Sequence, residues 1–189
     1  MTGSSSGDHL GQGLVHKACV PISCEVIDSF PSGSGYISIQ SDNEEVLHAI
    51  MMLEDAPREN PDDSSTEGQE IQRLETKINL MFELLAGLYR NELELPAPVD
   101  IALRSDAVEW QASESNLTRD TLVRLKLYLS NKYPKPVVLH GRITSSEDTT
   151  CVVFDDAVSE RCRDWIDKYI FRHHRRAVAM AKRESSTEV

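Results

Sequence analysis

Apolar side chains recur at alternating intervals of three and four residues along one stretch of the chain, and this repeat restricts the fold more than any other feature. Such spacing places the apolar residues along one side of an α-helix, at the a and d positions of a heptad. We therefore expect a helix over about residues 66–91 that self-associates as a coiled coil. The a positions are Ile71, Ile78 and Leu85, and the d positions are Leu74, Met81 and Leu88.

The residues beside this seam bear on how many helices associate. Ile at a with Leu at d favours dimers. Phe82 and Tyr89 at e, and Leu84 at g, add apolar surface that a two-stranded coil leaves exposed. We favour a homo-tetramer, with a homo-dimer as the alternative. A helix that packs on its own domain shows the same periodicity, so burial of this helix within the monomer is a second interpretation.

The second half of the chain consists of short segments in which apolar and polar residues alternate. A period of two is typical of strands with one buried face, and no helical pattern separates the segments. Serial short strands predict an antiparallel sheet, a sandwich or a small barrel. The segments are residues 99–104, 108–112, 123–129, 137–144 and 151–154.

A last helix is expected over about residues 159–182. Five apolar residues at i, i+3, i+4, i+7 and i+8 give it one wide apolar face, made of Cys162, Trp165, Ile166, Tyr169 and Ile170. We expect this face to dock the helix on the strands and to have no ligand role. The helix ends in Arg and Lys side chains, which suit the negative end of a helix dipole.

The first third of the chain gives weaker signals. Residues 1–35 are expected to be a flexible leader, within which residues 14–27 are weakly strand-like, and residues 36–40 alternate like a short strand. Residues 41–44 have the form of a capping box, with Ser at the start and Glu three residues later. A short amphipathic helix is expected behind it, over about residues 46–53. The acidic, Pro-containing residues 57–68 are expected to form a linker.

The charge of the chain excludes some classes of partner. The net charge is −11; residues 1–70 carry 13 acidic and 2 basic side chains, whereas residues 71–189 carry 18 of each. Nucleic acids and anionic membranes both require a basic face. No apolar run approaches the roughly 20 residues that span a bilayer, and the first residues lack the pattern of a secretory signal. We expect a cytoplasmic protein that binds no nucleic acid and does not insert into membranes.

Catalytic and metal-binding patterns are not found in the sequence. Cys19, Cys24, Cys151 and Cys162 are expected to be free thiols in a reducing cytosol, and their spacing does not match a metal site. The sequence has no Gly-rich phosphate loop and no Ser in a nucleophile-elbow context. We therefore expect a protein that is not an enzyme and that uses no metal or cofactor.

The strand-rich block and its final helix resemble the end of a PilZ domain. In that family a six-stranded β-barrel is followed by a helix in which an aromatic–aliphatic cluster precedes basic residues, as Tyr169-Ile-Phe171 precedes Arg172 here. Residues 137–143, with Gly141, and residues 151–154 also match patterns of the family. The resemblance covers about residues 93–182. It implies a mainly β fold with α: a six-stranded antiparallel barrel and a C-terminal helix, preceded by the coiled-coil region.

PilZ domains typically bind the bacterial second messenger cyclic di-GMP through two motifs. The first, R-x-x-x-R, precedes the first strand; here it reads Arg90-Asn-Glu-Leu-Glu94, with a carboxylate in place of the second Arg. The second, D/N-x-S-x-x-G, lies on the first hairpin; here it reads Leu103-Arg-Ser-Asp-Ala-Val108, and only Ser105 survives. Each lost charged contact costs roughly 1.5–3 kcal/mol. We expect weak or absent binding, with Arg90, Arg104 and Ser105 as the remnant of the site.

Atypical members of the family lack these motifs, carry heptad helices before the barrel and assemble as tetramers, which matches this chain. The resemblance implies a regulatory or adaptor protein in cyclic di-GMP-linked processes such as motility, pili or virulence, acting on an unidentified protein partner. A genuine cyclic di-GMP receptor with non-standard residues is the first alternative, and a small-barrel enzyme of unknown class is the second. The expected organisation is a leader (1–35), an oligomerisation region (36–92), the barrel with its helix (93–183) and a tail (184–189).

Overall fold

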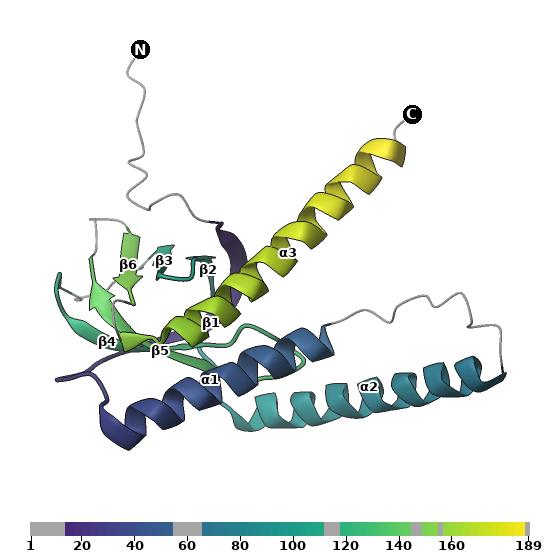
Figure 1. The fold of residues 1–189 in the computed structure, drawn as a ribbon, viewed down its shortest axis with the longest axis horizontal. Coiled ribbons are helices and arrows are strands. Elements are labelled where there is room, and N and C mark those ends of the chain that lie inside the picture. The colour runs from purple at the N-terminus through teal and green to yellow at the C-terminus, as the bar shows by residue number, and fades with distance from the viewer. Residues whose placement is uncertain (1–13, 55–65, 112–117, 145–148, 155–156, 188–189) are drawn as a thin grey trace, which may run out of the picture.

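The structure, a computed structural model, describes residues 14–54, 66–111, 118–144, 149–154 and 157–187. Within them, six strands form a closed antiparallel barrel in the order β1-β2-β3-β6-β5-β4, with three helices outside it (Figure 1). This confirms the predicted fold class. The strands are β1 (His16–Val26), β2 (Pro98–Leu103), β3 (Ala107–Gln111), β4 (Leu122–Leu127), β5 (Val137–Ile143) and β6 (Thr149–Val153). The helices are α1 (Gly33–Leu53), α2 (Thr66–Glu92) and α3 (Glu160–Thr187).

The sixth strand of the barrel comes from the region predicted to be a leader. β1 pairs with β2 through residues 16–21 and with β4 through residues 22–26, so it closes the barrel between two strands that would otherwise have open edges. The prediction of a flexible leader is therefore wrong for residues 14–35, whereas the weak strand-like character of residues 14–27 is confirmed by β1. Residues 1–13 lie outside the described part. Most β1 side chains are half-buried, which explains why its sequence shows no clean alternation.

Alternate side chains of the strands fill the barrel. On β4, for example, Val123, Leu125 and Leu127 are fully buried, and the two basic residues between them are only partly covered. Gly141 on β5 has a steric role. A Cβ atom there would overlap the carbonyl oxygen of Val153 and lie 2.6 Å from Cγ1 of Val152. The absence of a side chain thus lets β5 and β6 approach each other.

The helix α1 begins earlier than the sequence suggested. Ser32 occupies the N-cap position with an extended backbone. The strand predicted over residues 36–40 is wrong, because these residues are helical, and the predicted capping box at residues 41–44 lies inside the helix. Two buried polar residues, Gln40 and Asn43, extend the buried stripe towards the start of α1. Because these two buried residues are polar, the apolar periodicity of the sequence does not extend to them, and the predicted helix began too late.

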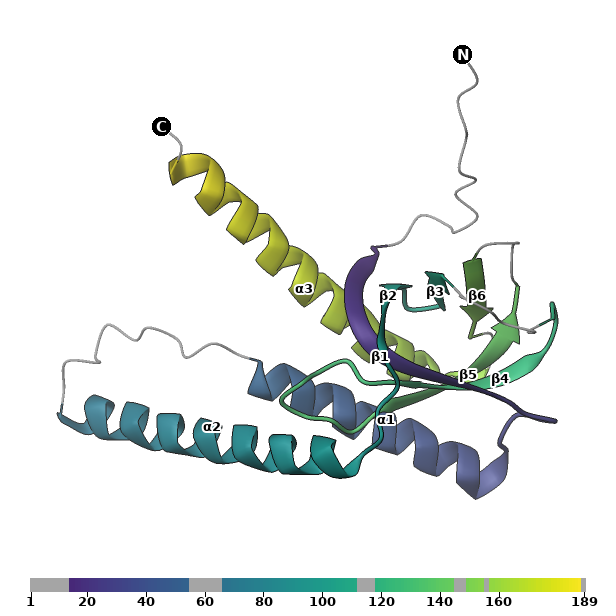
Figure 2. The same cartoon turned by 180° about the vertical axis from the view of Figure 1, so that it is seen from behind.

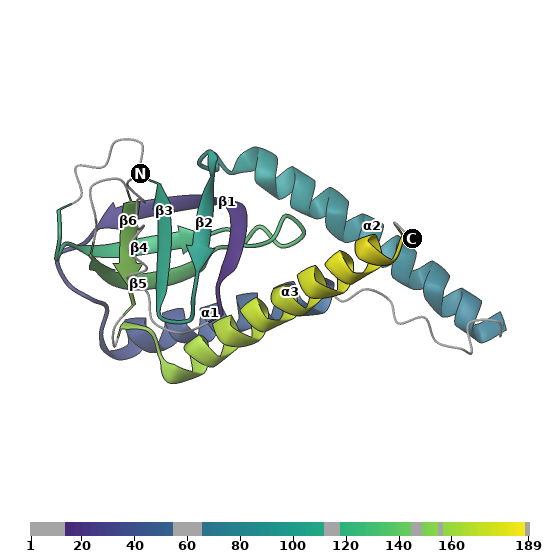
Figure 3. The ribbon, with the colours of Figure 1, turned by 90° about the horizontal axis from the view of Figure 1, so that it is seen from above.

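α1 and α3 pack against each other and against the barrel (Figures 1 and 3). α3 is capped by Ser159, whose hydroxyl accepts a hydrogen bond of 3.1 Å from the backbone N–H of Cys162. The predicted docking face is buried, except that Trp165 is only half-buried. The helix continues to Thr187, so the prediction of a tail from residue 184 is wrong as far as residue 187.

The helix α2 closely matches the prediction for residues 66–91 and leads into β2 through residues 93–97. It extends away from the barrel on the same side as the distal half of α3 (Figures 2 and 3). Among the described residues, no helix has the length and apolar character needed to cross a membrane.

Candidate functional site

The apolar seam of α2 lies on the surface of the monomer. Its six a and d residues have between 50% and 64% of their surface exposed. Ala86 is the one buried residue of the helix. The interpretation that α2 buries its seam within its own chain is therefore wrong. The seam consists of Ile71, Leu74, Ile78, Met81, Leu85 and Leu88.

Further apolar side chains widen this surface towards the C-terminus of α2. Phe82, Leu84 and Tyr89 are exposed and lie at e and g positions beside the seam, and Leu80, at a c position next to g, is also exposed. Soluble monomers rarely expose contiguous apolar patches larger than a few hundred Å². An α-helix that presents this much apolar surface along one side is suited to packing against other helices.

The predicted remnant of the ligand site is divided between two elements. Arg90 lies in the last turn of α2, where its Nε donates a hydrogen bond of 3.3 Å to the carbonyl of Ala86. Arg104 and Ser105 follow β2 in the turn before β3, which is closed by a hydrogen bond of 2.8 Å from the Arg104 N–H to the Ala107 carbonyl. Arg104 is only 8% exposed, so most of its side chain is withdrawn from solvent.

Leu103 and Val108, which align with the first and last positions of the D/N-x-S-x-x-G motif, belong to the barrel core. Leu103 and Val108 face each other across β2 and β3, and both are completely buried. Their side chains point into the barrel and away from its outer surface. Leu103 and Val108 therefore pack the barrel core. Their burial in the core by itself accounts for their apolar side chains.

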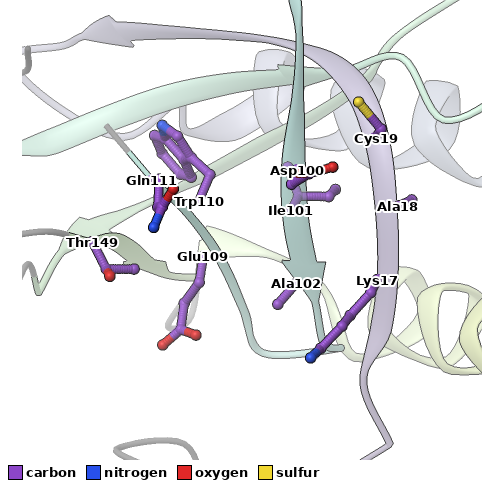
Figure 4. A pocket seen from close by; sticks show the side chains of 10 residues that line it. All are labelled: Lys17, Ala18, Cys19, Asp100, Ile101, Ala102, Glu109, Trp110, Gln111 and Thr149. Carbon is purple, nitrogen blue, oxygen red and sulfur yellow. The ribbon is translucent and has the colours of Figure 1, made fainter. Parts of the chain in front are cut away.

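The outer face of β1, β2, β3 and β6 carries a shallow groove of about 540 Å³ (Figure 4). Lys17 on β1 is opposite Ala102 on β2, which in turn is opposite Glu109 on β3, so all three lie in one outward row. Asp100 lies on the same groove, beside Cys19. Two carboxylates and one ammonium group thus line the groove, which makes it poorly suited to an anionic ligand.

The thiol of Cys19 in this groove is not activated. Desolvation raises its pKa, and the charge and hydrogen bond of Asp100 raise it further. A thiol with a raised pKa stays protonated and is a poor nucleophile. Sequence reasoning missed this groove, because β1 was assigned to the leader and its register with β2 was unknown.

A family model described as "Atypical PilZ domain, cyclic di-GMP receptor" matches residues 47–183, which is well over half of the chain. This chain belongs to the atypical PilZ family. The matched residues begin within α1, so β1, which closes this PilZ barrel, precedes them. No curated protein matches the chain.

A solved structure shares the fold of this PilZ protein. It is a pathogenic protein from Xanthomonas campestris, described as a new tetrameric PilZ domain self-assembled via an unusual helical bundle. The two are 17% identical, with a TM-score of 0.66 over 89% of this chain and 92% of that chain. At this identity, the likeness establishes the common architecture.

In this PilZ protein, a polar cluster joins the end of α1 to α3. Oε2 of Glu54 lies 3.1 Å from Nε2 of His173 and 3.6 Å from Nη1 of Arg176, both on α3. Arg172 donates a hydrogen bond of 2.7 Å to the Met51 carbonyl. The guanidinium groups of Arg172 and Arg176 also suit the negative end of the α1 dipole.

Burial and charge shift the acid–base properties of this cluster. The ring of His16 on β1 lies 4.5 Å from that of His173, and burial, with a smaller effect of His173, lowers the pKa of His16 to about 4. Burial raises the pKa of Glu54, but His173 and Arg176 together bring it below its ordinary value. Among the described residues, no group of three or more His, Cys, Asp or Glu side chains could hold a metal ion.

Proposed function

We propose that this PilZ protein is a non-catalytic, cytoplasmic regulatory adaptor in cyclic di-GMP-linked bacterial signalling, in processes such as motility, pili or virulence. It assembles into a homo-oligomer through α2, with a tetramer favoured over a dimer, and presents several barrels to a protein partner. Oligomerisation strengthens weak contacts with that partner, because linked sites bind at a high effective concentration.

The exposure of the α2 seam is the observation that carries this proposal. Six large apolar side chains at heptad spacing are half or more exposed in the monomer. Covering apolar surface contributes about 25 cal/mol per Å², so their burial between helices stabilises an oligomer. The apolar residues Phe82, Leu84 and Tyr89 beside the seam favour more than two helices. The Xanthomonas protein, which shares this architecture, is described as a tetramer built by a helical bundle.

The surroundings of the ligand remnant support weak or absent cyclic di-GMP binding. Arg90 is engaged by its own helix, and Arg104 is largely buried. Glu94 is exposed beside the barrel, and Asp100 and Glu109 line its outer groove. A dianionic ligand in this groove would meet the carboxylates of Asp100 and Glu109, and like charges a few ångströms apart repel each other. The adaptor therefore acts mainly through its assembly and its partner.

A double substitution in α2 tests the assembly. Ile78→Asp with Leu85→Asp places charges in the middle of the seam, where burial of an unpaired charge is strongly unfavourable. We expect wild type to sediment as an oligomer at micromolar concentration and the double variant to sediment as a monomer. Glu83→Ala, at the f position on the opposite side of α2, is the matched control and should stay oligomeric. A monomeric wild type would contradict the proposal.

A genuine cyclic di-GMP receptor is the second candidate. The family description, which names the family as a cyclic di-GMP receptor, favours it. Calorimetric titration of wild type with cyclic di-GMP separates the two candidates, because a receptor releases or absorbs binding heat at micromolar ligand and the adaptor does not. A small-barrel enzyme is the remaining alternative and would require a pocket with a nucleophile or an acid–base pair.

A further inference from the structure

The groove on the outer face of β1, β2, β3 and β6 has its floor on β2. This strand contributes the short side chains of Asp100 and Ala102 to the outer face, whereas β1 and β3 flank it with the longer side chains of Lys17 and Glu109 (Figure 4). α1 and α3 pack on β5 and β1. The groove is therefore open to a molecule that lies over β2.

The two carboxylates of this groove have only weak hydrogen-bond donors beside them. The Cys19 thiol donates a hydrogen bond to Asp100, and the Cys151 thiol donates one to Glu109. A thiol is a weak donor, so each carboxylate keeps the capacity to accept stronger hydrogen bonds. Among the described side chains, no Lys, Arg or His forms an ion pair with either carboxylate. The groove thus presents two acidic groups that a bound cation can neutralise.

The strand register fixes the spacing of these carboxylates. Ala102 is directly opposite Glu109, and Asp100 lies two residues before Ala102 on the same face of β2. Asp100 and Glu109 are therefore diagonal neighbours on antiparallel strands, a relation that separates residues by roughly 7–8 Å. In an extended chain, side chains on one face recur at every second residue, or about every 6.8 Å. Two cations at i and i+2 of an extended segment therefore match the two carboxylates.

The other side chains of the groove favour arginine in these positions and limit the number of cations. Gln111 and Thr149 face each other across β3 and β6 beside the carboxylates. Their side-chain oxygens accept hydrogen bonds, and a guanidinium group has five donors to share between a carboxylate and such neighbours. Lys17 on the β1 flank repels a third cation. The groove therefore suits two arginines better than a long basic run.

The closed barrel and its charges also restrict where such a segment comes from. A closed barrel has no free strand edge, so a bound segment is recognised by its side chains and not as an added strand. Arg124 and Lys126 on β4 have the i and i+2 spacing, but they are 3.5 Å and 3.1 Å from the carboxylate of Glu25. Because these two cations are already paired, a second copy of this chain is a poor occupant, and another protein is the better one.

We propose that this groove binds an extended segment of the partner protein in which two arginines are separated by one residue. The arginines pair with Asp100 and Glu109, and the residue between them points away from the groove. This inference rests on the proposed adaptor role and names the surface and the chemistry with which the adaptor recognises its partner. Single exposed ion pairs are weak, so one groove binds loosely, and an oligomer binds a partner with several such segments more tightly.

Labelled peptides test the spacing on wild type. One probe is a threonine peptide with a central Arg-Thr-Arg, and the matched probe has the same composition with the two arginines adjacent, which directs them to opposite faces. Fluorescence anisotropy should give a dissociation constant about fivefold lower for the Arg-Thr-Arg probe, because it forms two ion pairs at once. This difference should shrink at high salt. Equal constants, or tighter binding of the adjacent-arginine probe, would overturn the inference.

Substitutions locate the binding in the groove. Asp100→Asn with Glu109→Gln should abolish the preference for Arg-Thr-Arg, and Asp100→Arg with Glu109→Arg should create a preference for a Glu-Thr-Glu probe over one with adjacent Glu residues. Glu45→Gln with Glu83→Gln removes the same charge from α1 and α2 and should keep the wild-type preference. Melting temperatures check that each variant is folded. A preference that survives Asp100→Asn with Glu109→Gln would place the binding elsewhere and overturn the inference.

This inference and the proposed assembly fail in different measurements. Sedimentation of wild type reports the assembly, and the peptide titrations report the groove. An oligomer that shows no preference for Arg-Thr-Arg overturns the groove inference alone. A monomer that shows the preference contradicts the assembly and leaves the groove as the recognition surface.

Discussion

Asn43 shows how a polar residue becomes part of the core in this protein. Its amide donates a hydrogen bond of 2.7 Å to the Val138 carbonyl and accepts one of 2.8 Å from the Val138 N–H. Gln40, one helical turn earlier, accepts a bond of 2.9 Å from the Ser159 N–H. A buried polar group left unpaired costs about 1–3 kcal/mol. These amides therefore fix α1 in one position on the barrel and at the start of α3.

Gly141 leads to a prediction about packing between β5 and β6. Gly141→Ala forces a methyl group against the backbone of β6, and overpacking of this kind typically costs about 1–3 kcal/mol. We expect a lower midpoint in urea unfolding. Gly35→Ala is the control, because a Cβ there meets no neighbouring atom and Ala is the better helix former, so it should not destabilise. Equal midpoints for wild type and Gly141→Ala would show that β5 and β6 lie further apart.

The cluster at the end of α1 predicts a loss of stability in acid. Because the pKa of His16 falls from about 6.5 to about 4 on folding, the folded protein binds fewer protons at this site. The stabilising effect is complete above about pH 6.5 and declines as the pH falls towards 4. The lowered pKa of Glu54 acts in the same direction at still lower pH, below its ordinary value.

Melting temperatures measured between pH 7.5 and pH 4.5 test this prediction. Wild type should become less stable as the pH falls, and His16→Gln should flatten the decline because Gln does not titrate. His174→Gln is a matched control on an exposed histidine and should leave the slope of wild type unchanged. A His16→Gln profile parallel to that of wild type would count against a buried, neutral His16.

At the scale of elements, α3 has two parts with different roles. Its first half packs on α1 and the barrel, where Ile166, Tyr169 and Ile170 are buried. Beyond Arg176 the helix projects past the barrel, and the side chains of residues 177–183 are exposed. α2 has a similar division between a wide apolar half and a narrow acidic half. The stability of the monomer should therefore depend on the docked part of α3, and assembly on α2.

Tyr169 and Trp165 test the docking of α3. Tyr169→Ala removes a buried ring and should cost about 3–5 kcal/mol, as for other large aromatic-to-Ala changes. Trp165→Ala should cost less than half as much, because Trp165 is only half-buried, beside His48 and Lys168. Asp167→Ala on the exposed side should have little effect. Urea unfolding measures all three, and an equal cost for the two aromatic residues would mean that the helix is rotated.

At the scale of the whole molecule, the barrel divides into a covered side and an open side. α1 and the first half of α3 cover one part, and the groove on β1, β2, β3 and β6 stays open (Figure 4). Its charge comes from three different strands and is visible only after the barrel has closed. The open side therefore carries two carboxylates and one ammonium group, a charge balance that is poorly suited to an anionic ligand.

Removing carboxylates from the open side should create measurable cyclic di-GMP affinity. We expect no binding heat from wild type at micromolar ligand. Glu94→Arg replaces a carboxylate with a cation, Asp100→Asn and Glu109→Gln neutralise two more carboxylates, and all three positions lie outside the core. Restoring the motif at Leu103 and Val108 would instead put a carboxylate and a void into the core. Glu45→Gln is the control on a different surface, and tight wild-type binding would favour the receptor.

The sequence alone determined the features that depend on local periodicity. The heptads of α2, the docked face of α3 and the alternation in β2 to β6 all arise from side chains a few residues apart, so the chain reveals them directly. The family resemblance added the barrel and its number of strands. It could not show which segment supplied the sixth strand.

Tertiary structure decided the rest. β1 became a strand because β2 and β4 each offered it an edge, although its own side chains lack a clean pattern. From the sequence, Leu103 and Val108 were interpreted as substitutions in a ligand-binding motif, whereas the pairing of β2 with β3 places both in the core. Glu54 and His173 are far apart in the chain and meet only through the packing of α1 on α3. Such contacts depend on long-range register and burial, which no short window of the sequence records.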